Sequence, residues 1–352
     1  MKTVSTMWHT SKYFYLVVSL SMVPAFAANA QVAPEFFRGK TIMMYIGTGE
    51  SAGAVGAYPR AISQVIRKYI PGNPNVVVSN MPGAGGIKLA NFIQSQSLQD
   101  GLQWAFITRG FMLAPLLKVP GAQFEPTKFN WIGSPARTVS VGAVWTANTK
   151  IRTIEEAMKE EVVLGATAPN QDTAIFPNAL NRLTGTKFRI VTGYSSVGQV
   201  DIAMQRGEID GKVGFTWGSL MSGSSANWVR DGKVKVLVQL GMSKSRDIPT
   251  DVPLALDLAK TPEDRQVLEI LCGPSATGYP SFMGPNVPKD RVAIIRAAYE
   301  ATMKDPEFID ILQKQQLELD PIDGVELEAI VRDLYAKPAS AVERTKAIVP
   351  QG

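Results

Sequence analysis

The chain has 352 residues, of which 45% are hydrophobic, and its 36 basic side chains nearly balance 31 acidic ones. This balance, together with the absence of a basic run, argues against a nucleic-acid partner. A single cysteine excludes an internal disulfide and a thiolate-bound zinc or iron–sulfur cluster. The length suggests about two domains.

Residues 1–30 have the layout of a secretory signal peptide. Two lysines precede a mostly apolar stretch over 13–27, and Ala28-Asn29-Ala30 then supplies a small-x-small cleavage site. The alternative is a membrane anchor, but the apolar stretch is too short to span a bilayer comfortably. We therefore expect export, with cleavage near Ala30 and a soluble mature chain.

The only histidine, His9, lies within this expected signal peptide. The mature chain would then contain no histidine, which excludes a Ser-His-Asp triad, a Cys-His pair and a histidine-bearing metal site. Its charge would also fall, to 34 basic against 31 acidic residues, because two lysines are removed. We expect no enzyme activity, no metal and no cofactor.

Apolar, β-rich runs alternate with amphipathic stretches in the first part of the chain. The stretch over 57–70, for example, carries Ala61, Ile62 and Val65 at helical spacing. The pattern predicts strands over 41–46, 76–79, 102–108, 130–134 and 139–146, and helices over 57–70 and 87–96.

The middle of the chain repeats this rhythm. Thr153, followed three residues later by Glu156, predicts a capping box at the start of a helix over 153–159. Regular alternation of strands and helices predicts parallel sheets with helices on both faces. The further predicted elements are strands over 162–167, 188–192, 212–217 and 234–239, and helices over 172–183, 198–206 and 226–229.

The C-terminal third is mostly helical, with helices predicted over 263–271, 289–303, 306–316 and 324–334 and a candidate strand at 282–283. If the strands over 139–146 and 234–239 both cross between lobes, the chain forms an α/β fold of two doubly wound lobes joined by two crossing strands. Lobe 1 is then discontinuous and comprises 31–138 and 243–352. Lobe 2 comprises 139–242.

The most informative segment is Asn80-Met81-Pro82-Gly83-Ala84-Gly85-Gly86, which lies between a predicted strand and a predicted helix. A strand, a glycine-rich turn and a helix in this order leave backbone N–H groups free to bind an anion. The glycines let a ligand approach the backbone closely, because no Cβ intervenes. The alternative is a tight turn that binds nothing.

The turns after the other strands are further candidates, because ligands bind outside the carboxyl ends of the strands in such sheets. These turns are rich in Gly, Ser and Thr, which suits a small polar ligand and is also common in ordinary turns. The candidate ligand-binding residues are Gly47, Thr48, Gly49, Ser51, Gly53, Pro82, Gly83, Ala84, Gly85, Thr108, Arg109, Ala168, Gln171, Thr173, Gly193, Tyr194 and Trp217.

Three of these candidates have an alternative role. Arg109 either clamps a carboxylate through two parallel hydrogen bonds or is a solvated surface residue. Tyr194 and Trp217 stand at predicted strand ends, where they form either aromatic walls of the site or part of the lobe core. We expect the wall for both.

A dinucleotide-binding turn fits the first loop poorly. Gly47 and Gly49 are followed by Gly53, which falls one residue late for G-x-G-x-x-G. Asn80 stands where an acidic residue would bind the ribose. The sequence therefore disfavours a nicotinamide or flavin enzyme.

Several motifs together point to a known family. Residues 80–86 match N-x-P-G-A-G-G, and Asp100-Gly101 precedes the third strand as in D-G-[YT]. Weaker matches lie over 53–60, 193–194 and 305–308. Through these motifs the chain, from about residue 40 to 340, resembles the periplasmic Bug-type solute receptors of tripartite tricarboxylate transporters.

The resemblance implies a fold like that of the type II periplasmic binding proteins, with a ligand cleft between two lobes that close on the ligand. It implies a periplasmic receptor, which we expect to be monomeric, that binds a small organic acid through backbone N–H groups of two lobe 1 loops. Membrane transporter subunits would receive the ligand. The alternatives are a receptor of the same fold that reports to a membrane sensor, and a secreted cofactor-dependent α/β enzyme.

The chain departs from the family pattern at two places. Gly56 stands where many members carry an acidic residue four positions before the arginine, here Arg60. Such an acid would hold a ligand's amino or amide group, so its loss argues against an amino acid as the ligand. The loop over 166–173 also differs from the usual sequence, so ligand identity is not carried over.

Overall fold

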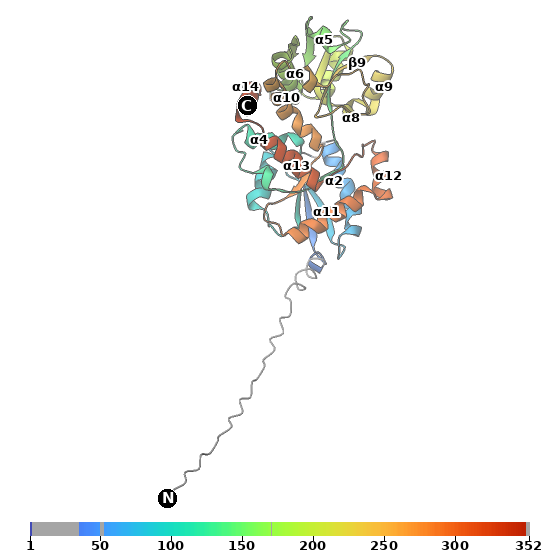
Figure 1. The fold of residues 1–352 in the computed structure, drawn as a ribbon. Coiled ribbons are helices and arrows are strands. Elements are labelled where there is room, and N and C mark those ends of the chain that lie inside the picture. The colour runs from blue at the N-terminus through green and yellow to red at the C-terminus, as the bar shows by residue number, and fades with distance from the viewer. Residues whose placement is uncertain (2–34, 50–52, 170, 350–352) are drawn as a thin grey trace.

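The computed structural model describes Met1 and residues 35–49, 53–169 and 171–349. These residues form two lobes, each built on one β-sheet and stacked end to end (Figure 1). The predicted signal peptide, apart from Met1, and the candidate residue Ser51 lie outside the described residues. Among the described helices, none has both the length and the apolar character that a membrane span requires.

The first sheet, which defines lobe 1, has six strands in the order β11-β4-β10-β3-β1-β2. β1 pairs in parallel with β2 and β3, whereas β10 is antiparallel to β3 and β4, and β11 is antiparallel to β4. The prediction of a parallel sheet is therefore right for the first three strands and wrong for β10 and β11. The chain reaches β10 from lobe 2, so this strand runs away from the lobe junction. The strands are β1 (Thr41–Ile46), β2 (Asn75–Asn80), β3 (Gln103–Phe106), β4 (Asn130–Ser134), β10 (Ser281–Met283) and β11 (Ile322–Asp323).

The second sheet, which defines lobe 2, has the order β7-β6-β8-β5-β9. β6 is parallel to β7 and β8, but β5 is antiparallel to β8 and β9. The prediction of a parallel sheet thus fails at β5, because β5 carries the chain into lobe 2 while β9 returns toward lobe 1. The strands are β5 (Ser140–Trp145), β6 (Val162–Gly165), β7 (Phe188–Val191), β8 (Gly211–Thr216) and β9 (Val234–Leu240).

Helices cover both sheets, and the predicted capping box of Thr153 and Glu156 at the start of α5 is confirmed. The sequence patterns did not predict α4, α8, α14 or the short strand β11. The helices are α2 (Ala54–Val65), α3 (Ile87–Asn91), α4 (Leu113–Leu116), α5 (Ile154–Ala157), α6 (Asp172–Leu183), α7 (Val197–Gln205), α8 (Trp217–Leu220), α9 (Ala226–Arg230), α10 (Pro262–Cys272), α11 (Lys289–Met303), α12 (Pro306–Lys314), α13 (Gly324–Tyr335) and α14 (Ala339–Ile348).

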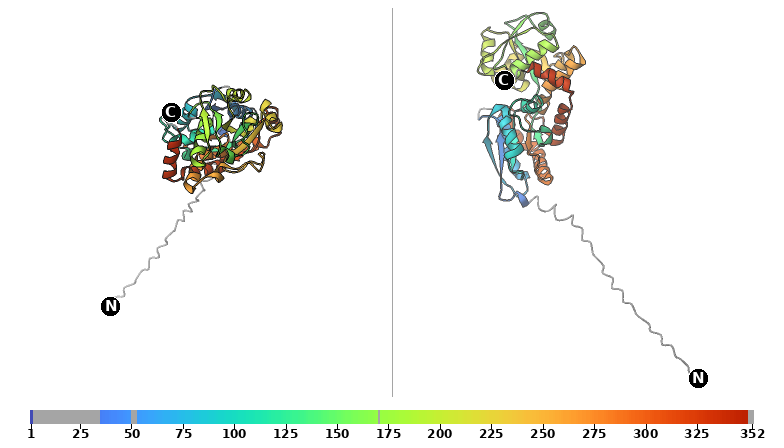
Figure 2. Two further views of the ribbon diagram at one scale, coloured as in Figure 1. Left: turned by 90° about the horizontal axis from the view of Figure 1, so that it is seen from above. Right: turned by 90° about the vertical axis from the view of Figure 1, so that its left-hand side faces the viewer.

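Lobe 1 has a buried core on each face of its sheet. Alternation along β3 divides the side chains, so that Trp104 packs in one core with residues of α2 and α11. Ala105 packs in the other core with Phe282 and with residues of α13. Figure 2 shows the C-terminal helices, in orange and red, packed along the N-terminal part of the chain, in blue and cyan. Lobe 1 is therefore assembled from both ends of the chain.

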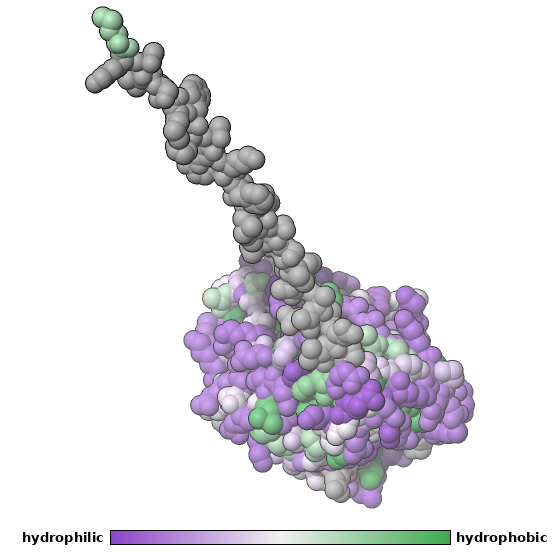
Figure 3. Space-filling view, turned by 90° about the horizontal axis from the view of Figure 1, so that it is seen from below, coloured by the Kyte–Doolittle hydropathy of each residue, from purple (hydrophilic) through white to green (hydrophobic). Residues whose placement is uncertain are grey.

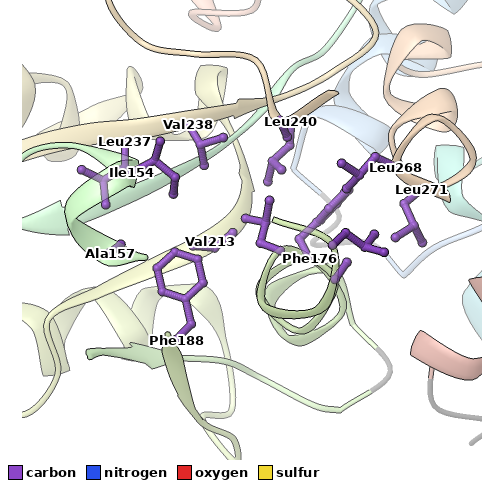
Figure 4. Close-up of a cluster of buried hydrophobic side chains, with 14 of the residues drawn as sticks. Ile154, Ala157, Phe176, Phe188, Val213, Leu237, Val238, Leu240, Leu268 and Leu271 are labelled. Atoms are coloured by element: carbon purple, nitrogen blue, oxygen red, sulfur yellow. The ribbon is translucent and has the colours of Figure 1, made fainter. Parts of the chain in front are cut away.

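The core of lobe 2 includes residues from the C-terminal third. Phe176 of α6 lies beside Leu268 and Leu271 of α10 (Figure 4), and Ile348 of α14 belongs to the same cluster. Helices beyond residue 242 thus pack against the second sheet, although the predicted boundary assigns them to lobe 1. The residue limits of the two lobes stay a prediction.

The chain passes from the first sheet to the second between β4 and β5 and returns between β9 and β10. The carboxyl ends of β1 to β3 therefore point toward lobe 2. The view from below shows a mostly hydrophilic face with scattered apolar residues (Figure 3). The candidate ligand-binding loops of lobe 1 lie at its other end, where the lobes meet.

Candidate functional site

Three loops of lobe 1 are tied together where β1, β2 and β3 end. The Asn80 side chain donates to the Thr48 backbone oxygen at 2.7 Å, and its own oxygen accepts from Arg60 at 2.9 Å. The Thr108 hydroxyl donates to the Gly85 backbone oxygen at 3.1 Å. The structure thus brings the first, second and third predicted loops into one cluster.

The loop after β2 has a backbone that requires glycine at Gly86. Its φ is +99°, and a Cβ there would lie 2.5 Å from Cγ1 of the buried Ile107. At Gly85, where φ is +62°, a Cβ would meet no atom within 4 Å. The chain therefore packs tightly on one side of this loop and leaves open space beside Gly85.

Two backbone N–H groups of this loop point to a binding role. Pro82 and Gly83 lead from β2 into a single 3₁₀ turn over Ala84–Gly86, in which Gly86 N–H donates to the Gly83 oxygen. Among the described residues, no acceptor takes the N–H group of Ala84 or Gly85. Unpaired N–H donors beside open space are groups from which an anionic oxygen can accept hydrogen bonds.

The loop after β1 lies against the same cluster. Gly47 N–H donates to the Phe106 oxygen at 2.8 Å, and a Cβ on Gly47 would come within 2.9 Å of Ile107. Gly49 ends the described part of the loop before residues 50–52, and Gly53 is the N-cap of α2. Within the described part of the chain, the buried Thr48 hydroxyl has no hydrogen-bond partner.

An open pocket of about 560 Å³ begins at the N-terminal end of α2. Arg60 is the charged residue among the described residues that line it, and it also donates to the Gly56 oxygen at 2.8 Å. The pocket thus offers a cation and a helix N-terminus together. Its lining is Gly53, Gly56, Ala57, Arg60 and Gln315.

Arg109 links the two lobes directly. Its Nη2 donates to the Ser140 hydroxyl of β5 at 2.9 Å and lies 3.6 Å from Oδ2 of Asp172. The side chain is only 16% exposed. Of the two predicted roles, the solvated surface residue is disfavoured, because the guanidinium is enclosed between the lobes.

The predicted residues at the end of β6 gather around Thr167. The Thr173 hydroxyl accepts from Thr167 N–H at 3.1 Å, and Gly193 N–H donates to the Thr167 oxygen at 3.0 Å. Gln171 N–H donates to the Ala168 oxygen at 3.1 Å. Ala168, Gln171, Thr173 and Gly193 are therefore close to one another near the start of α6.

The two aromatic candidates lie in the packing of lobe 2. Trp217 is 6% exposed and packs with Val141 and Phe215. Tyr194 is half-buried against the cluster that includes Val200. For Trp217 the burial favours the core over the expected aromatic wall, because little of its ring surface is open to a ligand.

The predicted set omits one group at the junction, formed by Tyr58, Tyr279 and Glu318. The Tyr58 hydroxyl donates to the Glu318 backbone oxygen at 2.6 Å, and its ring lies 4.8 Å from that of Tyr279. The Glu318 carboxylate faces Gly218 of lobe 2, where a Cβ would lie 3.2 Å from Oε1. No motif marks these residues, since they come from distant parts of the chain.

The carboxylates at the junction have perturbed acidities. Desolvation by the surrounding protein raises the pKa of Asp172, although 53% of its side-chain surface stays exposed, and Arg109 partly offsets this effect. Burial also raises the pKa of Glu318, with smaller contributions from Asp247 and Asp320. The junction therefore disfavours additional negative charge next to these two carboxylates.

No family profile matches the chain, and no curated protein matches it in sequence. Solved structures do match its fold. A TctC solute-binding protein from Polaromonas, solved without ligand, shares 16% identity at a TM-score of 0.66, covering 87% of this chain and 98% of that one. The periplasmic binding protein BugD shares 16% identity with this chain at a TM-score of 0.58. The match covers 88% of this chain and 98% of BugD.

MatC from Rhodopseudomonas palustris, solved with bound malate, shares 17% identity at a TM-score of 0.57 and covers 88% of this chain and 99% of its own. A second R. palustris protein, solved with adipate, shares 15% identity with this chain at a TM-score of 0.59. The match covers 88% of this chain and 98% of that protein. At such identities the likeness shows the fold. The protein has the two-lobed α/β fold of the TctC- and Bug-type periplasmic solute-binding proteins.

Proposed function

We propose that the protein is a non-enzymatic, extracytoplasmic receptor of the Bug type. It binds a small carboxylated organic solute where the two lobes meet and delivers it to a tripartite tricarboxylate-type transporter. A periplasmic location, a monomeric state and a signal peptide cleaved near Ala30 are parts of this proposal.

The observation that carries the proposal is that the N–H groups of Ala84 and Gly85 find no acceptor among the described residues and lie beside open space. A carboxylate oxygen satisfies such donors better than water does, because its full charge strengthens the hydrogen bonds. Arg60 lies within the same cluster through its bond to Asn80. It adds positive charge to the surroundings of the bound carboxylate.

The structural neighbours support the class of ligand. Malate, bound to MatC, and adipate, bound to the other R. palustris protein, are both small organic acids. The shared fold places the carboxyl ends of β1 to β3 opposite lobe 2, where ligands bind in open α/β sheets. Both the shared fold and the chemistry of the loops therefore support a small organic acid as the ligand.

A thermal-shift screen of the purified mature chain tests binding. Organic acids, sugars and inorganic cations are added in turn, and the ligand class should raise the melting temperature, because it binds the native state alone. We expect shifts with carboxylates. A shift with a sugar or a cation, and none with any carboxylate, would refute the proposal.

Delivery needs a separate test in cells. Deletion of the gene should abolish uptake of the acid that binds in the screen. If uptake persists while a response to that acid is lost, the receptor reports to a sensor and the transport part of the proposal fails.

A further inference from the structure

Arg109 contacts the point at which the chain enters and leaves lobe 2. Its Nη2 donates to the hydroxyl of Ser140, the first residue of β5, at 2.9 Å. Ser140 pairs with Leu240, the last residue of β9, so the two strands that carry the chain into and out of lobe 2 meet here. Ser140 is fully buried. A hydrogen bond in such surroundings is stronger than one in water.

The same guanidinium also reaches the start of α6, beyond this meeting point of the strands. Nη2 lies 3.6 Å from Oδ2 of Asp172, the first residue of the helix. Close packing holds Asp172 in lobe 2, since Gly214 of β8 has a φ of +86° and a Cβ there would collide with the Asp172 backbone oxygen. The attraction between Arg109 and Asp172 therefore acts on the body of lobe 2.

On the lobe 1 side, Arg109 is attached to the loop that carries the proposed anion site. Thr108, the preceding residue, donates from its hydroxyl to the Gly85 backbone oxygen at 3.1 Å. Arg109 itself begins a 3₁₀ turn over Arg109–Met112, in which Phe111 and Met112 are buried. The residue is thus fixed both to the turn around Gly85 and to the core of lobe 1.

The guanidinium has little surface left for a ligand. The side chain is 16% exposed, and Nη2 is engaged by two groups of lobe 2. A carboxylate bound through both Nη atoms would compete with Ser140 and Asp172 for Nη2. These contacts favour a role between the lobes over the ligand clamp that the sequence suggested as one alternative.

We propose that Arg109 is a positioning residue of the binding site, which holds lobe 2 at its observed angle to lobe 1. This inference rests on the proposed function and extends it from the ligand to the lobes. When the guanidinium is removed, the lobes sample other separations, and only part of the population keeps the arrangement that binds ligand. The apparent affinity then falls in proportion to that fraction, for every ligand alike.

Distances between the lobes test the inference in the ligand-free mature chain. Spin labels on Glu160→Cys of lobe 2 and Glu300→Cys of lobe 1 report the separation by double electron–electron resonance. Both positions are exposed. The native Cys272 is fully buried, so the labels attach only to the introduced cysteines.

Three variants are compared in this labelled chain. Arg109→Gln should broaden the distribution of interlobe distances, and Ser140→Ala should broaden it to a smaller extent. Arg189→Gln is the matched control, because it removes a guanidinium that forms an exposed ion pair with Glu161 at 2.9 Å. It should leave the distribution unchanged. Circular dichroism checks that each variant is folded, and Ser140→Ala decides the question if Arg109→Gln is not.

Calorimetric titration with the acids that bind in the screen adds the functional measurement. Arg109→Gln should bind each of them about fivefold more weakly, by the same factor. Arg189→Gln should bind as the parent chain does. Adding Ser140→Ala to Arg109→Gln should cause little further loss, because both substitutions break the same hydrogen bond.

Two results would overturn the inference. One is an unchanged distance distribution in folded Arg109→Gln; a loss of affinity in that case would make Arg109 a ligand clamp. The other is a broadened distribution with unchanged affinity, which would make the contact structural only. The proposed function fails separately, when no carboxylate in the wider screen binds, and the distance measurement then decides by itself whether Arg109 holds the lobes.

Discussion

The two lobes contribute different kinds of group to the junction between them. Lobe 1 contributes backbone: the turn at Ala84 and Gly85 offers N–H groups, and its shape depends on positive φ angles and on contact with Ile107. Lobe 2 contributes side chains, with Asp172 at the start of α6. Backbone donors suit any carboxylate, whereas side chains can differ from one protein to another. On the proposed function, the lobe 1 turn would bind the carboxylate that all candidate ligands share.

The largest expected effect is on the free energy of unfolding. It appears when a crowded glycine of lobe 1 is substituted and compared with an open glycine of lobe 2. Gly86→Ala should lower the free energy of unfolding by about 2–4 kcal/mol, because a Cβ would approach Ile107 and φ is +99°. Gly193→Ala has a similar φ, +107°, with nothing within 4 Å, and should lose about 1 kcal/mol. Urea denaturation measures both, and equal losses would show that crowding by Ile107 is unimportant.

A charge placed in the lobe 1 loop should affect binding more than stability. Gly85→Asp should reduce carboxylate affinity by about tenfold or more through repulsion and steric block. Gly232→Asp is the matched control, because its φ of +69° and its open surroundings resemble those of Gly85. Calorimetry with an acid from the screen decides the matter. Unchanged affinity in folded Gly85→Asp would mean that the loop is structural only.

Removal of the interlobe guanidinium should have an intermediate effect. Arg109→Gln loses the contact with Asp172 and lengthens or breaks the bond to Ser140, so the free energy of unfolding should fall by about 1 kcal/mol. Arg189→Gln, which breaks an exposed ion pair with Glu161, should cost no more than a few tenths of a kcal/mol. Equal losses in the two variants would argue against a linking role for Arg109.

The smallest expected effect is a contrast in pH dependence between two aspartates. Hydrogen bonds from Lys68 and Tyr69 lower the pKa of Asp305 to about 2, so its contribution to stability should be lost as pH falls from about 4 toward 2. Desolvation by the surrounding protein raises the pKa of Asp172, so its protonated carboxyl favours the folded state below about pH 4 and loses this contribution as pH rises.

Urea denaturation at several pH values measures this contrast. Asp305→Asn should flatten the loss of stability at acid pH. Asp172→Asn should gain stability relative to the parent chain as pH rises above 4. Parallel stability profiles for the parent chain and both variants would contradict the two opposite shifts.

Local sequence patterns predicted much of the secondary structure. The limits of β1, α6 and α11 agree with the predicted ranges, and Thr153 caps its helix as expected. These features depend on periodicity and capping within a few neighbouring residues. The mixed direction of both sheets was not predicted, because strand direction depends on the lobe from which the chain arrives.

The candidate site was predictable only in part. The glycine motif over 80–86 identified the loop, because turn geometry is encoded locally. Ser140 and Glu318 reach the junction through tertiary contacts alone, and no pattern near them in the sequence signals it. Trp217 shows the opposite case, since its position at a strand end suggested exposure and the packing of lobe 2 buries it.

The sequence by itself determined the order of the elements, the glycine turn beside the second strand and the exclusion of histidine chemistry from the expected mature chain. These follow from residue type and short-range spacing. The tertiary structure decided which strands pair, which helices complete each core, and that Arg109 of lobe 1 reaches Ser140 and Asp172 of lobe 2. Such contacts join residues far apart in the chain, and they arise only when both lobes are packed.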